Sequence, residues 1–164
     1  MKICIYGAGA IGGTIAVRLA QAGHAVSVVA RGAHLAAIRE NGLTLQKGEE
    51  RVTVRVPAAA DGADFGVQDA VIIAVKAHGI RAALSGISPL IGTDTSVVPA
   101  INGVPWWFFD RWGGSLAGKR LDSCDPDGAI AGAIAYERVI GGIVYLAADS
   151  PSPGVVRHTS GNRL

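Results

Sequence analysis

The first hundred residues alternate between short apolar runs and segments in which apolar residues recur at helical spacing. The runs are rich in Val, Ile and Ala, which is typical of strands covered on both faces of a parallel sheet. They occupy residues 2–6, 25–30, 70–75 and 95–100. Their alternation with helical segments predicts an α/β fold with a doubly wound, mostly parallel sheet.

The segments between these runs predict helices and one hairpin. Two polar-flanked runs, residues 43–46 and 51–56, surround a turn-like tetrapeptide and predict a hairpin inserted into the alternating order. Each predicted helix ends at a Gly or just before a Pro, which are the usual stop signals. The helices are marked by Ile11, Ile15 and Leu19 before Gly23, by residues 33–41 before Gly42, and by Ile80, Leu84 and Ile87 before Pro89.

The pattern changes after Asn102, where an aromatic cluster and turn-rich sequence replace the alternation. All three Trp and two of the three Phe lie within residues 106–112. Such a cluster favours packing against another domain or subunit, so a homo-oligomer is possible. The alternative is that these aromatic side chains form a substrate pocket. Beyond it the sequence predicts a short helix at residues 127–135 and strands at residues 139–147 and 154–158.

Length and composition narrow the class of protein. The 164 residues, 49% of them hydrophobic, suit one domain spanning 1–164 with a substantial core. The 23 Gly have no collagen-like period, so they call for another explanation. The formal charge is +2 without a dense basic run, and no apolar stretch is long enough to span a bilayer. These features predict a small-molecule partner, with no nucleic acid and no membrane.

The Cys and His residues indicate neither a disulfide framework nor a metal site. Cys4 and Cys124 stand far apart, which fits a reducing, cytoplasmic compartment. The histidines are scattered without acidic companions at ligand spacing, so each is expected to be a surface or hydrogen-bonded histidine. They are His24, His34, His78 and His158.

A glycine-rich hexapeptide directly follows the first predicted strand and opens the first helix. Its G-x-G-x-x-G spacing in this context predicts a Rossmann-type dinucleotide site, with a structural Gly-rich turn as the alternative. Gly7 makes the tight turn, Gly9 lets a pyrophosphate approach the backbone, and Gly12 allows close helix packing. The predicted cofactor-binding residues of this loop are Gly7, Ala8, Gly9, Ala10, Ile11 and Gly12.

The residue after the second predicted strand indicates which dinucleotide binds. Sites that prefer NAD carry Asp or Glu at this place to bond the ribose 2′-hydroxyl, whereas this sequence has Arg31. A guanidinium pairs with the 2′-phosphate of NADP through two hydrogen bonds, so Arg31 predicts NADP(H) as cofactor. A solvated Arg at the start of a helix is the alternative.

Two polar residues follow the later parallel strands. Lys76 comes after the third predicted parallel strand and Asn102 after the fourth, and these carboxyl ends line the ligand crevice of open α/β sheets. A cation and a neutral hydrogen-bond donor there could orient a ketone and stabilise charge on its oxygen. A solvated Lys and a turn-forming Asn are the corresponding alternatives.

Five collinear segments together resemble the ketopantoate reductase (2-dehydropantoate 2-reductase) family. The resemblance implies NADPH-dependent reduction of 2-dehydropantoate, a small 2-keto acid, to pantoate in pantothenate biosynthesis. It also implies that Arg31 holds the cofactor, that Lys76 and Asn102 contact cofactor and substrate, and that the backbone of Ala148 lies near the nicotinamide. The segments are GAGAIGG from Gly7, ARGAHLAAIRENGL from Ala30, AVKAH from Ala74, INGV from Ile101 and PGVVRHTSGNRL from Pro153.

The chain also departs from the family. Members continue into a mostly helical C-terminal domain that supplies a general-acid Lys, and no counterpart of that domain is found in these 164 residues. The resemblance therefore implies an NADP-binding domain, truncated relative to the family, that binds cofactor without appreciable turnover. A reductase of another 2-keto acid and a non-enzymatic NADP-binding sensor module remain as alternatives.

Overall fold

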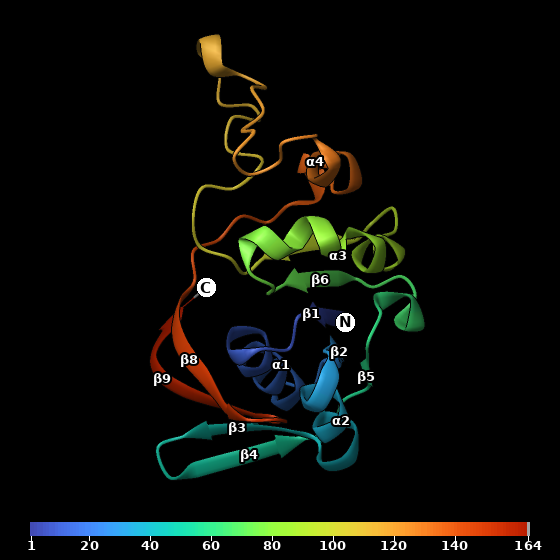
Figure 1. The fold of residues 1–164 in the computed structure, drawn as a ribbon, viewed down its shortest axis with the longest axis vertical. Coiled ribbons are helices and arrows are strands. Elements are labelled where there is room, and N and C mark those ends of the chain that lie inside the picture. The colour runs from blue at the N-terminus through green and yellow to red at the C-terminus, as the bar shows by residue number, and fades with distance from the viewer. Residues whose placement is uncertain (164) are drawn as a thin grey trace.

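A five-stranded parallel sheet forms the centre of the protein. The computed structural model describes residues 1–163; Leu164, the last residue of the expected domain, lies outside them. The strand order is β5-β2-β1-β6-β7, in which β1 pairs with both β2 and β6, so the winding direction reverses at β1 (Figure 1). The strands are β1 Lys2–Tyr6, β2 Ala25–Val29, β5 Ala58–Ala59, β6 Ala70–Ile73 and β7 Ser96–Pro99. The α/β, Rossmann-type expectation is confirmed.

Helices cover both faces of this sheet, and the central strands are apolar for that reason. Along β1, Ile3 and Ile5 belong to the core beneath α1 and α2, whereas Cys4 and Tyr6 belong to the core beneath α3. Successive side chains of one strand therefore enter two separate cores. The helices are α1 Ala10–Gln21, α2 Gly32–Asn41, α3 Ile80–Ile87 and α4 Ala129–Ala133. Short 3₁₀ turns lie at Gly62–Phe65, Ala77–Gly79, Ser88–Leu90, Gly114–Leu116 and Tyr136–Arg138.

A second sheet of four strands, in the order β4-β3-β9-β8, packs against the outer side of α1 (Figure 1). The predicted hairpin at residues 43–56 exists, but it pairs with the late strands rather than with the parallel sheet. Here β3 runs parallel to β9, with Leu45 beside Val156. The strands are β3 Leu43–Lys47, β4 Glu50–Val54, β8 Tyr145–Ser152 and β9 Val155–Arg163.

Glycines let α1 approach both sheets. A Cβ added to Gly12 would lie 2.9 Å from the Cβ of Ala74 and would also meet the carbonyl oxygen of Gly7. At the next position, a Cβ on Gly13 would lie 2.7 Å from Cγ1 of Val156 in β9. Since carbon atoms do not approach so closely, these two positions require residues without a side chain.

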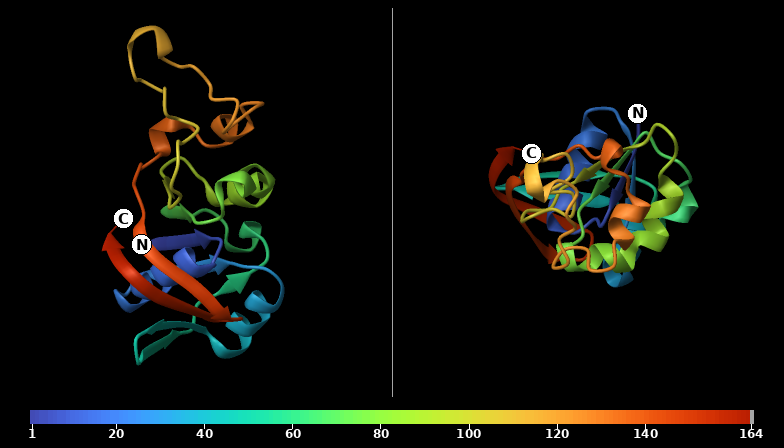
Figure 2. Two further views of the ribbon diagram at one scale, coloured as in Figure 1. Left: turned by 60° about the vertical axis from the view of Figure 1, so that its left-hand side comes forward. Right: turned by 90° about the horizontal axis from the view of Figure 1, so that it is seen from above.

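Residues 103–143 leave the end of β7, extend beyond the sheet and return to its edge (Figure 2). The predicted helix in this segment is confirmed as α4, but the expected strand at residues 139–147 is not continuous. Val139 forms only an isolated bridge with Val97, and β8 begins at Tyr145. The N–H of Ile140 donates to the carbonyl of Val97 at 2.8 Å, which fixes the return of the segment to β7.

Within residues 1–163, no helix combines the length and the apolar character that a membrane crossing needs.

Substitution of Gly12 tests the close packing of α1. We expect Gly12→Ala to lower the free energy of unfolding by about 1–3 kcal/mol, because the added methyl meets backbone and Ala74. Gly132→Ala is the matched control, since its Cβ meets nothing within 4 Å and Ala favours helix α4. Chemical unfolding followed by circular dichroism measures both, and equal stability of the two variants would contradict close packing at Gly12.

Candidate functional site

A cleft of about 1240 Å³ opens at the carboxyl ends of the parallel strands. Its floor is the loop between β1 and α1, and its walls come from the segments after β2, β6 and β7. Strand β8 of the second sheet closes one side through residues 146–150. A crevice at the point where the strand order reverses is the usual ligand site of open α/β sheets.

The glycine-rich loop is tied down so that the first turn of α1 faces the cleft. The N–H groups of Gly7 and Ala8 both donate to the carbonyl of Val29, at 3.1 and 2.9 Å. Gly7 has φ +102°, a left-handed conformation that favours Gly. A Cβ on Gly9 would meet nothing within 4 Å, so open space lies directly over the backbone there. The first two glycines of the motif thus have different roles. Gly7 is needed for the turn, and Gly9 leaves space for a ligand over the backbone.

The N-terminus of α1 carries no competing group. No side chain caps it, and no acidic residue lies in its first turn. Its first N–H groups and the positive end of the helix dipole are therefore free to bind an anion. This geometry fits the pyrophosphate of a dinucleotide.

The charges around the cleft also favour an anionic ligand. Exposed Arg31 and Lys76 both line it. Asp149 is the acidic residue among its described lining, and this carboxylate pairs with Arg157, whose Nε lies 3.0 Å from Oδ1. The cationic groups are thus left without an acidic competitor at the cleft wall.

Arg31 lies at the start of α2, beside the phenol of Tyr6. Burial raises the pKa of Tyr6 above its ordinary value of 10, and the nearby positive charge of Arg31 opposes this rise. Tyr6 is consequently a neutral phenol at neutral pH, and it does not cancel the charge of Arg31. The guanidinium remains a cation at the end of β2, where a ribose 2′-substituent would bind.

Asn102 lies in the cleft wall as expected, but its amide has a structural partner. Its Nδ2 donates to the carbonyl of Val144 at 3.0 Å, and its Oδ1 accepts from the N–H of the same residue at 2.8 Å. This pair of bonds joins the end of β7 to the segment that enters β8. The second N–H of the Asn102 amide is left for a ligand.

The sequence profile described as ketopantoate reductase PanE/ApbA matches residues 3–105, which include the glycine loop, Arg31, Lys76 and Asn102. This match covers more than half of the chain. The chain belongs to the ketopantoate reductase family.

Similar proteins support this membership over the whole chain. A 2-dehydropantoate 2-reductase of Mesorhizobium japonicum is 52% identical over 165 residues, which cover 100% of this chain and 51% of that protein. A crystal structure of a candidate ketopantoate reductase from Ralstonia solanacearum MolK2 has 51% identity and a TM-score of 0.91, over 97% of this chain and 49% of the other. The chain thus spans about half the length of the relatives it matches.

A more distant structural neighbour is a complex with NADH. The complex of D-mandelate dehydrogenase with NADH is 26% identical, with a TM-score of 0.72, over 98% of this chain and 44% of the other. The ketopantoate reductase family and this neighbour are oxidoreductases, and both use a nicotinamide cofactor.

Ala148 lies in β8 and lines the cleft, and its expected place near a nicotinamide stays a prediction. It pairs with His158 of β9. Among residues 1–163, no group of three or more His, Cys, Asp or Glu side chains is arranged to hold a metal ion.

His34 has a part in the site that its sequence position does not reveal. It is hydrogen-bonded, as expected for an ordinary histidine. Its two partners, however, lie in loops of different sheets. Nδ1 accepts from the N–H of Gly154 in the β8–β9 turn at 3.0 Å, which leaves Nε2 to donate to the carbonyl of Ala8 at 2.7 Å. His34 therefore joins the glycine loop to the second sheet. The only sequence signal was its place within the family-like segment from Ala30.

Substitution of Gly9 tests whether the loop between β1 and α1 binds a dinucleotide phosphate. We expect Gly9→Ala to weaken NADPH binding at least tenfold by isothermal titration calorimetry, because the methyl fills the space over the backbone. The thermal unfolding midpoint should stay within 2 °C, since the Cβ meets no protein atom. Gly132→Ala, outside the cleft, should leave the NADPH affinity unchanged, and an unaltered affinity of Gly9→Ala would refute a phosphate site at this loop.

Removal of the His34 side chain tests its link between loop and sheet. We expect His34→Ala to lower the free energy of unfolding by about 1–3 kcal/mol, because it leaves two backbone groups without partners. NADPH affinity should fall as well, since Ala8 loses its support. His34→Gln keeps a donor and an acceptor and should recover part of both losses; if it behaves like His34→Ala, the two hydrogen bonds are not the cause.

Proposed function

We propose that this chain binds NADPH as the cofactor-binding half of an enzyme that reduces 2-dehydropantoate to pantoate in pantothenate biosynthesis. The observation that carries the proposal is the uncapped α1 N-terminus beneath open space at Gly9, with Arg31 rather than an acidic residue after β2. The 52% identity with a 2-dehydropantoate 2-reductase supports the choice of substrate.

Several groups that line the cleft would each bind one part of the cofactor or the substrate. When bound, NADPH supplies hydride to the ketone carbon. The α1 N-terminus binds the pyrophosphate, and Arg31 pairs with the 2′-phosphate. The Lys76 ammonium and the remaining N–H of Asn102 orient the carboxylate and ketone of the substrate, while the β8 backbone at Ala148 lies along the nicotinamide.

Reduction of another 2-keto acid is the second candidate. The likeness to D-mandelate dehydrogenase favours it, since that neighbour acts on a larger, aromatic hydroxy acid. Both candidates share the cofactor site and differ in the group that the keto acid carries.

Cofactor titration tests the proposal. We expect the chain to bind NADPH at least tenfold more tightly than NADH, because a bidentate guanidinium–phosphate pair contributes about 1.5–3 kcal/mol. Arg31→Ala should remove this preference by weakening NADPH binding alone. Arg51→Ala, on β4 outside the cleft, removes the same charge and should leave the preference intact. Comparable affinities of the wild type for both cofactors would overturn the assignment of Arg31.

A further inference from the structure

The segment 103–143 carries a loop that stands clear of both sheets (Figures 1 and 2). Its end is the 3₁₀ turn Gly114–Leu116, which is drawn at the top of Figure 1. The N–H of Gly118 donates to the carbonyl of Phe109 at 2.9 Å, and this bond closes the loop. The loop is thus the part of the molecule that reaches farthest from the parallel sheet, where another molecule can contact it.

Three large apolar side chains are exposed on this loop, and we call them the apolar tip: Phe108, Trp112 and Leu116. Their exposed fractions are 37%, 61% and 39%. The rings of Phe108 and Trp112 stack with centroids 5.1 Å apart and planes 24° apart, so they form one continuous apolar surface. Neighbouring exposed apolar groups of this size are typical of a surface that binds another molecule.

The backbone of the loop is held in a strained conformation. Among residues 1–163, Arg111 is the one residue other than Gly with a left-handed φ, at +56°. Its guanidinium donates to Glu137 at 2.7 Å and lies over the ring of Tyr136, 5.3 Å from the centroid. A left-handed conformation is unfavourable for a residue with a side chain, and these contacts stabilise it here. They tie the loop to the returning chain while Phe108 and Trp112 remain exposed.

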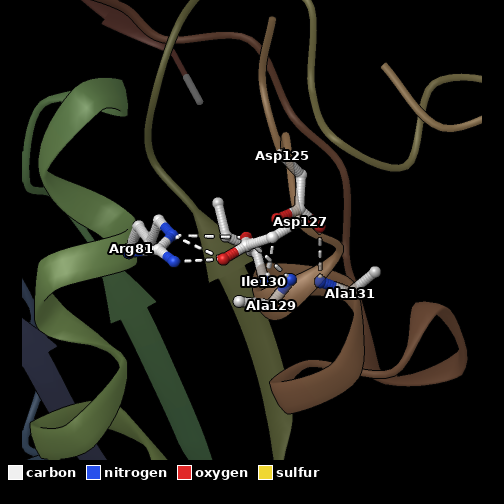
Figure 3. Close-up of polar contacts among 6 residues, drawn as sticks. All are labelled: Arg81, Asp125, Asp127, Ala129, Ile130 and Ala131. Atoms are coloured by element: carbon white, nitrogen blue, oxygen red, sulfur yellow. Dashed lines mark hydrogen bonds and ion pairs between the residues drawn. The ribbon is translucent and has the colours of Figure 1, made fainter. Parts of the chain in front are cut away.

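The base of the same segment is bonded to the main body. The carboxylate of buried Asp125 accepts from the N–H groups of Ile130 and Ala131, each at 3.0 Å (Figure 3). Arg81 of α3 pairs with Asp127, with Nε 3.0 Å from Oδ2 (Figure 3). The Arg81 hydrogen bond lowers the pKa of the Asp127 carboxyl to about 2, so the pair stays ionised at neutral pH. The apolar tip therefore projects from a segment that is anchored at its base.

Two charged side chains beside the apolar tip, Asp110 and Lys119, have no ion-pair partner among residues 1–163. Each directly follows one of the two residues that make the closing hydrogen bond of the loop. The neighbouring Arg111 and Arg120, in contrast, are both paired. A surface with one unpaired anion and one unpaired cation is complementary to a copy of itself turned by 180°. A nucleic acid or an anionic membrane would instead favour cations alone.

We propose that the apolar tip is a self-association surface through which two copies of this chain form a symmetric dimer. The two tips pack against each other about a two-fold axis, and Asp110 of each copy pairs with Lys119 of the other. Three large side chains per copy make a small interface, so the dissociation constant is about 1–100 µM. Dimerisation does not depend on the proposed reductase function, because none of these residues lines the cofactor cleft.

Sedimentation velocity of the chain tests the inference at concentrations from about 1 to about 200 µM, which bracket the expected dissociation constant. The mass should rise from monomer to dimer, and Trp112→Ser should raise the dissociation constant at least tenfold, because Trp is a frequent hot spot of interfaces. Val67→Ser is the matched control, since Val67 is 58% exposed but lies on the main body before β6. It should dimerise like the wild type.

A wild-type chain that stays monomeric over the whole range would overturn the inference. Monomers that sediment with vesicles of phosphatidylcholine and phosphatidylglycerol would overturn it as well, because the apolar tip would then be a lipid contact. Either result would leave the reductase proposal standing.

Charge reversal tests whether the two-fold contact is correct. Asp110→Lys and Lys119→Asp should each weaken dimerisation at least tenfold, because like charges then face each other twice across the interface. The double variant, and an equimolar mixture of the two single variants, should associate like the wild type, since opposite charges face each other again. Thermal unfolding midpoints should match the wild type, because neither charge is paired within the chain. Failure of both combinations to restore dimerisation would overturn the two-fold contact.

Discussion

Helix α1 lies between two β-sheets, and its first turn approaches both of them through residues without a side chain. Gly12 lets the helix touch β1 and the segment after β6, and Gly13 lets β9 approach from the other side. The same turn presents its N–H groups to the cleft. The proposed phosphate site and the packing of the core therefore share one short stretch of backbone, which holds four of the 23 Gly.

The parallel sheet was predictable because its strands follow strong local rules. Runs such as residues 2–6 and 25–30 are apolar on both faces and end at turn signals. The second sheet was not predictable, since its key contact joins Leu45 to Val156 across more than a hundred residues. Periodicity reports how a strand is buried but not which strand it pairs with. Strand β5, with two residues, was too short to give any pattern.

Some features of the candidate site could likewise be predicted from the sequence, and others could not. The G-x-G-x-x-G spacing and Arg31 were readable because their chemistry depends on a local strand–turn–helix order. The bonds of Asn102 to Val144 and of His34 to Gly154 were not readable, since their partners lie 42 and 120 residues away. Similarly, the aromatic cluster was visible in the sequence, but only the fold shows that Trp106 and Trp107 line a cavity beside Asn102.

The parallel pairing of β3 with β9 has a consequence for biosynthesis. A ribosome releases residues 1–99, which contain every strand of the parallel sheet, well before residues 155–157 emerge. During that interval α1 lacks its contacts with β8 and β9, although β3 and β4 are already translated, and Nδ1 of His34 has no Gly154 to bond. The link from the glycine loop through His34 to the β8–β9 turn thus forms only when non-local pairing closes the second sheet.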